Sequence, residues 1–191
     1  METLGLTPSR KADSMWRNLL WPTIRTEVDV DQVGRQGFWL CVILAAFTLV
    51  IDLIGGLYIS GIREAAFYVL GGMGVRQRSR IAAVVIFSTY LLSAIAVFKF
   101  TGRGPGFLGV IFLALLFANV RGTLLSAKWR PDATEPPPIR LTATFGDRLA
   151  DQLPIHVWPI GQWFFLALAF LEIGLLLMLI FWPEALFFRI V

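Results

Sequence analysis

The chain is poor in the residues that thiol, zinc and haem chemistry need. Its 191 residues include one cysteine, Cys41, and one histidine, His156. A single cysteine excludes an intramolecular disulfide, and the two residues together fall short of the about four Cys or His ligands of a structural zinc site. A haem held between two histidines of the chain is excluded by the same count. We therefore predict no metal ligand, no cofactor and no catalytic residue, and an enzyme is the least favoured of the functions considered below.

Charged residues are also scarce. Only 16% of the residues are charged and 57% are hydrophobic, with a net charge of +4 and a mean hydropathy of +0.70. Soluble domains are about a quarter charged. The basic residues cluster beside the apolar runs, so lipid headgroups are their expected partners. No basic face suited to nucleic acid is visible, and we predict no nucleic-acid partner.

The apolar residues form long runs, which predict an all-α fold: a polytopic transmembrane helix bundle of about five spans. The runs of the core membrane domain (37–128) and the last span are residues 37–59, 61–75, 81–98, 106–128 and 159–182. A helix needs about twenty apolar residues to cross a bilayer, so residues 61–75 either cross a thinned bilayer or re-enter. If they re-enter, four spans remain. Residues 1–36 are predicted to form a cytoplasmic or interfacial segment with a short amphipathic helix. Residues 129–158 form a proline-rich cytoplasmic loop with a short interfacial helix, and residues 183–191 form a short tail.

The distribution of lysine and arginine predicts the orientation. With five spans and the N-terminus inside, the inner side holds twelve basic residues: Arg10, Lys11, Arg17, Arg25, Arg35, Arg76, Arg78, Arg80, Lys128, Arg130, Arg140 and Arg148. The outer side holds four: Arg63, Lys99, Arg103 and Arg189. Cytoplasmic loops carry the excess of Lys and Arg, so we predict a cytoplasmic N-terminus and an outer C-terminus.

Three carboxylates at membrane depth are the candidate proton or ion site. Asp52 and Glu172 lie roughly 22 and 20 Å from the inner edges of their spans at about 1.5 Å per residue, and Glu64 lies above them. Carboxylates sharing a low-dielectric site could share a proton or hold a cation. In the alternative interpretation, Lys99 or Arg103 reaches down from the outer edge and neutralises them, or the carboxylates point at different neighbours.

Small residues recur at every fourth position of the run at 106–128 and predict a helix-packing face: Ala114, Ala118, Gly122 and Ser126. Such a face lets another helix approach closely in lipid. The same run holds an intramembrane polar pair, Asn119 and Arg121. Helix rise places Arg121 about 12 Å from the depth of Asp52, so we predict no ion pair between those two residues.

Short motifs resemble those of small multi-pass bacterial membrane proteins of unassigned function. They are Leu20-Trp-Pro-Thr-Ile24, Arg78-Ser79-Arg80 and Asn119-Val-Arg-Gly-Thr123. After Thr123 the chain continues Leu-Leu-Ser-Ala, where the resemblance leads us to expect an aromatic residue and a histidine. The resemblance implies a bacterial inner-membrane setting and supplies no activity and no catalytic residue.

Three functions stay open on these patterns. The first is an accessory or scaffold protein in the lipid bilayer that forms a homo- or hetero-oligomer through the small-residue face. The second is a small oligomeric transporter or channel that uses the intramembrane carboxylates. The third is a membrane enzyme acting on lipid or quinone, for which the expected histidines and acidic motifs are missing.

Overall fold

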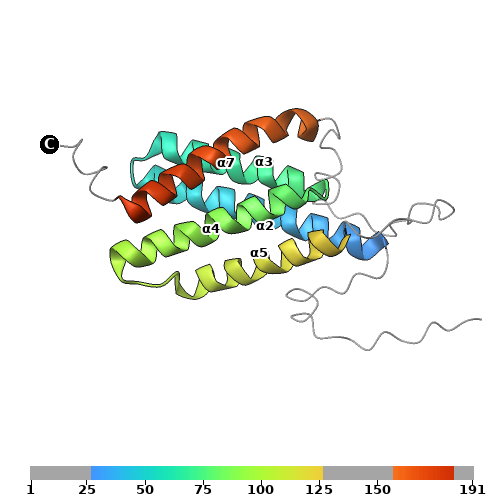
Figure 1. Cartoon of the computed structure of the whole chain (residues 1–191), viewed down its shortest axis with the longest axis horizontal. Helices are drawn as coiled ribbons and strands as arrows, with labels where there is room; N and C mark the ends of the chain where they lie inside the picture. The colour runs from blue at the N-terminus through green and yellow to red at the C-terminus, as the bar shows by residue number, and fades with distance from the viewer. Residues whose placement is uncertain (1–26, 127–156, 183–191) are drawn as a thin grey trace, which may run out of the picture.

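The computed structural model describes residues 27–126 and 157–182, which form five helices and, within these ranges, no strand (Figure 1). The helices are α2 (Glu27–Ile54), α3 (Tyr58–Arg76), α4 (Arg80–Thr101), α5 (Gly106–Ser126) and α7 (Val157–Phe181). The prediction of an all-α helical bundle is confirmed. The predicted short helices of the N-terminal segment and of the proline-rich loop, and the predicted tail, lie outside the described residues.

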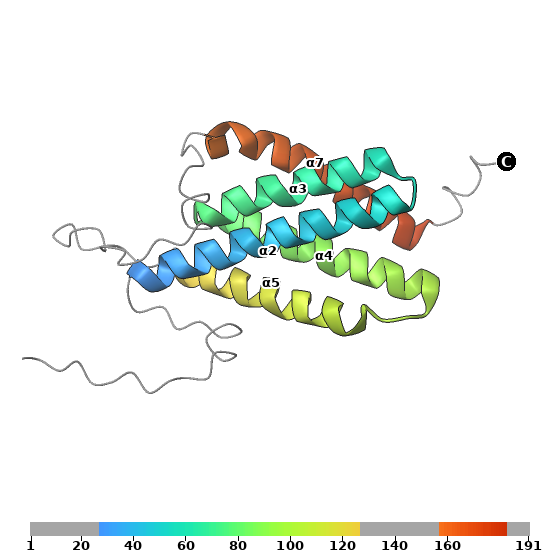
Figure 2. The same cartoon turned by 180° about the vertical axis from the view of Figure 1, so that it is seen from behind.

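The helices run alternately up and down. The start of α2 lies against the ends of α3 and α5, where Gly34 faces Arg76 and Gly122 faces Val33. The start of α7 lies beside the end of α3, where Gly161 faces Leu70. Each helix packs on the next around a closed ring in the order α2, α3, α7, α4, α5, and α3 also contacts α4 (Figures 1 and 2). One end of the bundle therefore gathers the starts of α2, α4 and α7 and the ends of α3 and α5.

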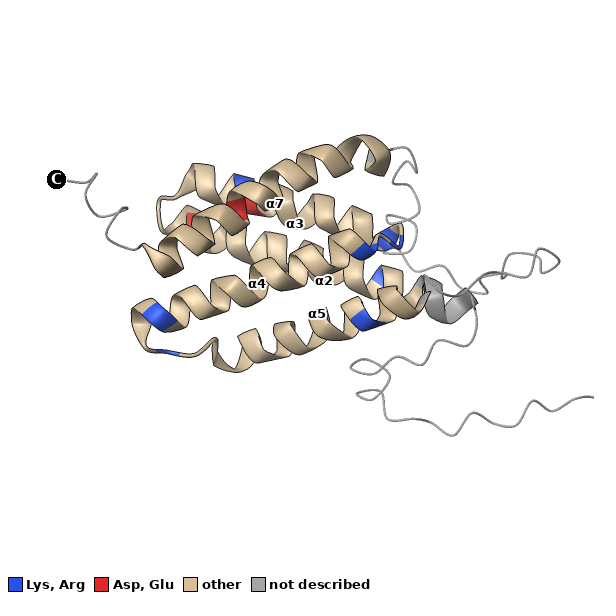
Figure 3. Ribbon diagram, viewed as in Figure 1, with Lys and Arg blue, Asp and Glu red and all other residues tan. Residues whose placement is uncertain are grey.

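Most basic residues of the described helices lie at this same end, which we term the basic end (Figure 3). They are Arg35, Arg76, Arg78, Arg80 and Arg121. Lys99 and Arg103 lie at the opposite end, at the α4–α5 turn, and Arg63 lies inside the helical region.

The outside of the bundle is apolar. Four helices are long and apolar enough to cross a membrane, over Gln32–Ile54, Arg80–Thr101, Gly106–Leu125 and Trp158–Phe181. Large apolar side chains such as Ile59 and Phe170 are 85% and 84% exposed, whereas Thr89, Asn119 and Glu172 are buried. A water-soluble fold has the reverse arrangement. The chain is an integral membrane protein.

The short second segment is a continuous helix. α3 extends over 19 residues, about 28 Å at the usual rise, and packs along α2. A continuous helix of this length favours the thin crossing over the re-entrant alternative, although α3 is not among the four helices apolar enough to span by composition. α3 is less apolar than the other four helices because it carries Arg63 and Glu64 and four glycines.

The first span differs from its predicted bounds at both ends. α2 begins ten residues before Gly37, because its polar lead continues the helix without a break. It ends at Ile54 and not at residue 59. Gly56 has φ +74°, and the Leu57 N–H donates to the Asp52 carbonyl at 2.8 Å, the bond that closes a Schellman motif.

Candidate functional site: a charged cluster beside a polar cavity

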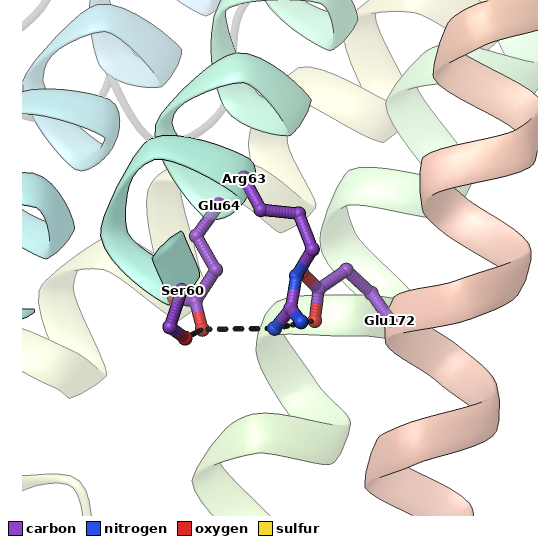
Figure 4. A network of polar contacts seen from close by, with 4 residues as sticks. All are labelled: Ser60, Arg63, Glu64 and Glu172. Carbon is purple, nitrogen blue, oxygen red and sulfur yellow. Dashed lines mark hydrogen bonds and ion pairs between the residues drawn. The ribbon is translucent and has the colours of Figure 1, made fainter. Parts of the chain in front are cut away.

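Three ionisable side chains meet between α3 and α7 (Figure 4). Arg63 Nε donates to Glu172 Oε1 at 2.6 Å, and its Nη2 donates to Oε2 at 3.4 Å. Arg63 Nη2 also lies 3.9 Å from Glu64 Oε1, which accepts a hydrogen bond of 3.5 Å from Ser60 Oγ. A two-point guanidinium–carboxylate contact fixes both side chains. Glu172 is only 5% exposed, so its charge depends on this arginine.

The antiparallel packing of α3 and α7 brings these residues together. Arg63 and Glu64 lie within two turns of the start of α3, and Glu172 lies nine residues before the end of α7. The two positions share a level in the half of the bundle away from the basic end. With both carboxylates ionised, Arg63, Glu64 and Glu172 carry a net charge of −1.

A small cavity lies next to this cluster, where α3, α4 and α7 meet. Its volume is about 30 Å³, and it is lined by Glu64, Phe67, Tyr68, Thr89, Ser93, Glu172 and Leu176. That space suffices for about two water molecules. Polar lining groups come from all three helices: carboxylates from α3 and α7, the Tyr68 phenol from α3 and hydroxyls from α4. Thr89 is 4% exposed, and its Oγ1 has no hydrogen-bond partner.

An aromatic plug, formed by Phe67, Phe165 and Trp158, separates this cavity from the basic end. The rings of Phe67 and Phe165 stack at 5.2 Å and 13°, and Trp158 lies 5.7 Å from Phe165. Phe165 is fully buried and packs close to Gly71. Packed rings therefore lie between the polar cavity and the basic end.

Glu64 and Glu172, two of the three carboxylates predicted as a site, line one cavity. Asp52 does not line it. It packs against Gly61, where an added Cβ would lie 2.8 Å from the Asp52 Cβ. Its Oδ2 is buried and has no hydrogen-bond partner. Asp52 therefore lies near the cluster, against Gly61 of α3, without lining the cavity.

The counter-ion of the cluster is Arg63, which the sequence reasoning assigned to an outer loop. Lys99, one of the two cations proposed for this role, instead donates from Nζ to the Ile180 carbonyl at the end of α7. Arg103 lies in the exposed α4–α5 turn. The adjacent pair Arg63-Glu64 inside an apolar run is the sequence signal that could have identified this counter-ion. With a first span predicted to reach residue 59, Arg63 instead falls near the membrane edge.

The small-residue face of α5 is occupied from within the chain. Ala118 and Gly122 are buried, and a Cβ on Gly122 would lie 2.5 Å from Val33 Cγ1 of α2. Ala114 is exposed, and the side chain of Ser126 lies outside the described residues. The expectation that this face binds another protein therefore finds no support in the packing.

The polar pair of α5 lies toward the basic end. Asn119 is buried, packs against Gly37 of α2, and its Oδ1 has no hydrogen-bond partner. Arg121 lies at the opposite end of the bundle from Asp52. That separation agrees with the prediction that those two residues form no ion pair.

No family model, no curated protein and no solved structure matches this chain.

Proposed function

We propose that this chain is a small membrane protein that passes protons, with Glu64 and Glu172 as the proton-binding groups and Arg63 as their counter-ion. The observation that carries the proposal is the charged cluster beside a polar cavity inside an apolar bundle. Ionisable groups are costly at this depth and typically mark proton or ion pathways. Within the cluster, Glu64 is the better proton acceptor, because Glu172 holds the short contact to Arg63.

The geometry favours this function over the scaffold. On the face that would dock another helix, Gly122 is covered by Val33 of α2 and Ala118 is buried. A cavity of about 30 Å³ suits water and protons better than the headgroup or ring of a lipid or quinone substrate.

Passage across the membrane requires a second conformation. Phe67 and Phe165 close the route from the cavity to the basic end. In that second conformation the rings of Phe165 and Trp158 would move away from Gly71 and Gly74 of α3, against whose backbone they pack here. A proton bound at Glu64 is then released toward the basic end when the plug opens.

We place the protein in a bacterial inner membrane, which the motif resemblance suggests, with the basic end facing the cytoplasm. The positive-inside rule supports this orientation. Because the five helices alternate in direction, this orientation predicts that residues 127–156 lie in the cytoplasm and that the C-terminus lies outside.

Proton flux into liposomes tests the proposal. The purified full chain is reconstituted with a pH-sensitive dye inside, and a potassium diffusion potential with valinomycin drives the protons. Glu64→Gln should lower the flux at least about tenfold, whereas the matched neutralisation Arg103→Gln in the exposed turn should leave it unchanged. Equal flux for Glu64→Gln and the unsubstituted chain, or no flux above empty liposomes, would refute the proposed function.

A further inference from the structure

We propose that the cavity between α3, α4 and α7 also binds one dehydrated sodium-sized cation, which competes with the proton. This inference rests on the proposed function, because it assigns a second ligand to the same cavity. Its ligands are the hydroxyl oxygens of Thr89 and Ser93 and a carboxylate oxygen of Glu64.

Thr89 provides the observation that points to a ligand. In a helix, a buried threonine hydroxyl usually donates to a carbonyl one turn earlier. Thr48 in α2 does so, to the Leu44 and Ala45 carbonyls at 3.0 and 3.2 Å, and Thr101 donates to Val97 at 2.8 Å. Thr89 makes no such bond although it is more deeply buried, and Thr89 is one of the residues that line the cavity. Its oxygen is therefore available to an occupant of the cavity.

Charge and size select the ligand. Arg63 cancels one of the two carboxylate charges, so the cavity lacks a single positive charge. A monovalent cation balances the summed charge of Arg63, Glu64 and Glu172, and the nearby Asp52 carboxylate, which does not line the cavity, adds to the attraction for a cation. Carboxylate and hydroxyl oxygens are ligands that hard cations prefer. A volume of about 30 Å³ admits a dehydrated small ion and about one water molecule.

The site differs from a transition-metal centre. Among the described residues, no group of three or more His, Cys, Asp and Glu side chains could hold a metal ion. Two carboxylates, one of them held by Arg63, and neutral hydroxyls instead form a site of low charge. A proton on Glu64 removes the same negative charge that sodium would balance, so the two occupants exclude each other.

Thermal unfolding of the detergent-purified full chain tests the inference. A ligand that binds only the folded state raises Tm as its concentration rises. In NaCl, Tm should rise with concentration above its value in choline chloride of equal ionic strength. Thr89→Val, which keeps the shape and removes the hydroxyl, should abolish that difference. Thr48→Val, the same change at a hydroxyl bonded to its own helix, should retain it.

Two further measurements keep the inference testable if Thr89→Val does not fold. Ser93→Ala is a milder change and should also reduce the sodium-dependent rise in Tm. In a weakly buffered sample of the unsubstituted chain, NaCl should release protons and choline chloride should not. Equal Tm in the two salts, an undiminished sodium effect in Thr89→Val, or no proton release on addition of sodium would overturn the inference.

The two proposals fail separately. Proton flux in sodium-free liposomes that depends on Glu64, together with no sodium effect on Tm, would leave the proposed function standing and overturn the sodium site. A sodium effect lost in Thr89→Val, together with unchanged flux for Glu64→Gln, would support the site and refute proton passage.

Discussion

Removing Arg63 should destabilise the protein more than removing Glu172, although the two residues form one ion pair. Glu172→Gln leaves the guanidinium with a neighbouring carboxylate, because Glu64 Oε1 lies 3.9 Å from Nη2. Arg63→Met leaves two carboxylates in an apolar bundle with no described cation paired to them. The order of the two effects therefore tests whether Glu64 shares the arginine.

The magnitudes follow from burial. Breaking a buried ion pair by removing one partner costs about 3–5 kcal/mol, because the other charge stays buried. That range applies to Arg63→Met, since Glu172 is 5% exposed. For Glu172→Gln we expect about 1.5–3 kcal/mol, the loss of a hydrogen bond to a charged group, because Arg63 is 26% exposed and keeps Glu64. Replacing both partners by apolar residues, Arg63→Met with Glu172→Leu, should recover much of the loss.

Equilibrium unfolding in mixed detergent micelles, followed by circular dichroism, gives the free energies. Lowering the pH should reduce the cost of Arg63→Met, because protonation removes the charge that the arginine balances. Arg103→Gln in the exposed turn is the control and should change the free energy of unfolding by less than about 0.5 kcal/mol. If Glu172→Gln costs as much as Arg63→Met, Glu64 is no alternative partner, and the shared-arginine description of the cluster is refuted.

Three further changes test the packing. Gly122→Leu should lower the free energy of unfolding by about 1–3 kcal/mol because it overpacks against Val33, and Val33→Ala should partly restore it. An unchanged free energy of unfolding would contradict the α2–α5 contact. Phe165→Ala should cost about 3–5 kcal/mol and raise proton leak into liposomes, and a leak equal to that of the unsubstituted chain would mean that the plug is no barrier. Lys99→Met removes the cation at the Ile180 carbonyl and should lower the free energy of unfolding by about 0.3–1 kcal/mol. Hydrogen exchange should become faster only in the last turn of α7, and an equal increase along the whole helix would argue against a local role.

The membrane bundle could be predicted because apolar runs of spanning length have few other uses. The helix ends were less accurate for a physical reason. Hydropathy places a boundary where polar residues begin, yet the polar residues before Gly37 continue α2 as a helix. At the other end, Gly55 and Gly56 end the helix inside an apolar run, through a backbone conformation that hydropathy does not detect.

The candidate site could be predicted only in part. Helix rise gave the depths of Glu172 and Asp52 and so identified which carboxylates share a level. Rise says nothing of rotation about the helix axis, and rotation separates Glu64, which faces the cavity, from Asp52, which faces Gly61. The small-residue face of α5 shows the same limit. Its spacing predicted a close helix neighbour, and only the packing shows that α2 of the same chain is that neighbour.

The depth of the cluster has an electrical consequence. Glu172 lies nine residues from Phe181, about 14 Å at the usual rise, which is roughly two fifths of α7. A charge that enters from that end thus crosses a similar fraction of the transmembrane voltage before it is bound. One elementary charge crossing the full field gains about 2.3 kcal/mol per 100 mV, so occupancy of Glu64 should respond by about 0.9 kcal/mol per 100 mV. The remaining three fifths of the voltage falls between the cluster and the basic end, so a charge that passes the plug would gain the larger part of the energy, about 1.4 kcal/mol per 100 mV.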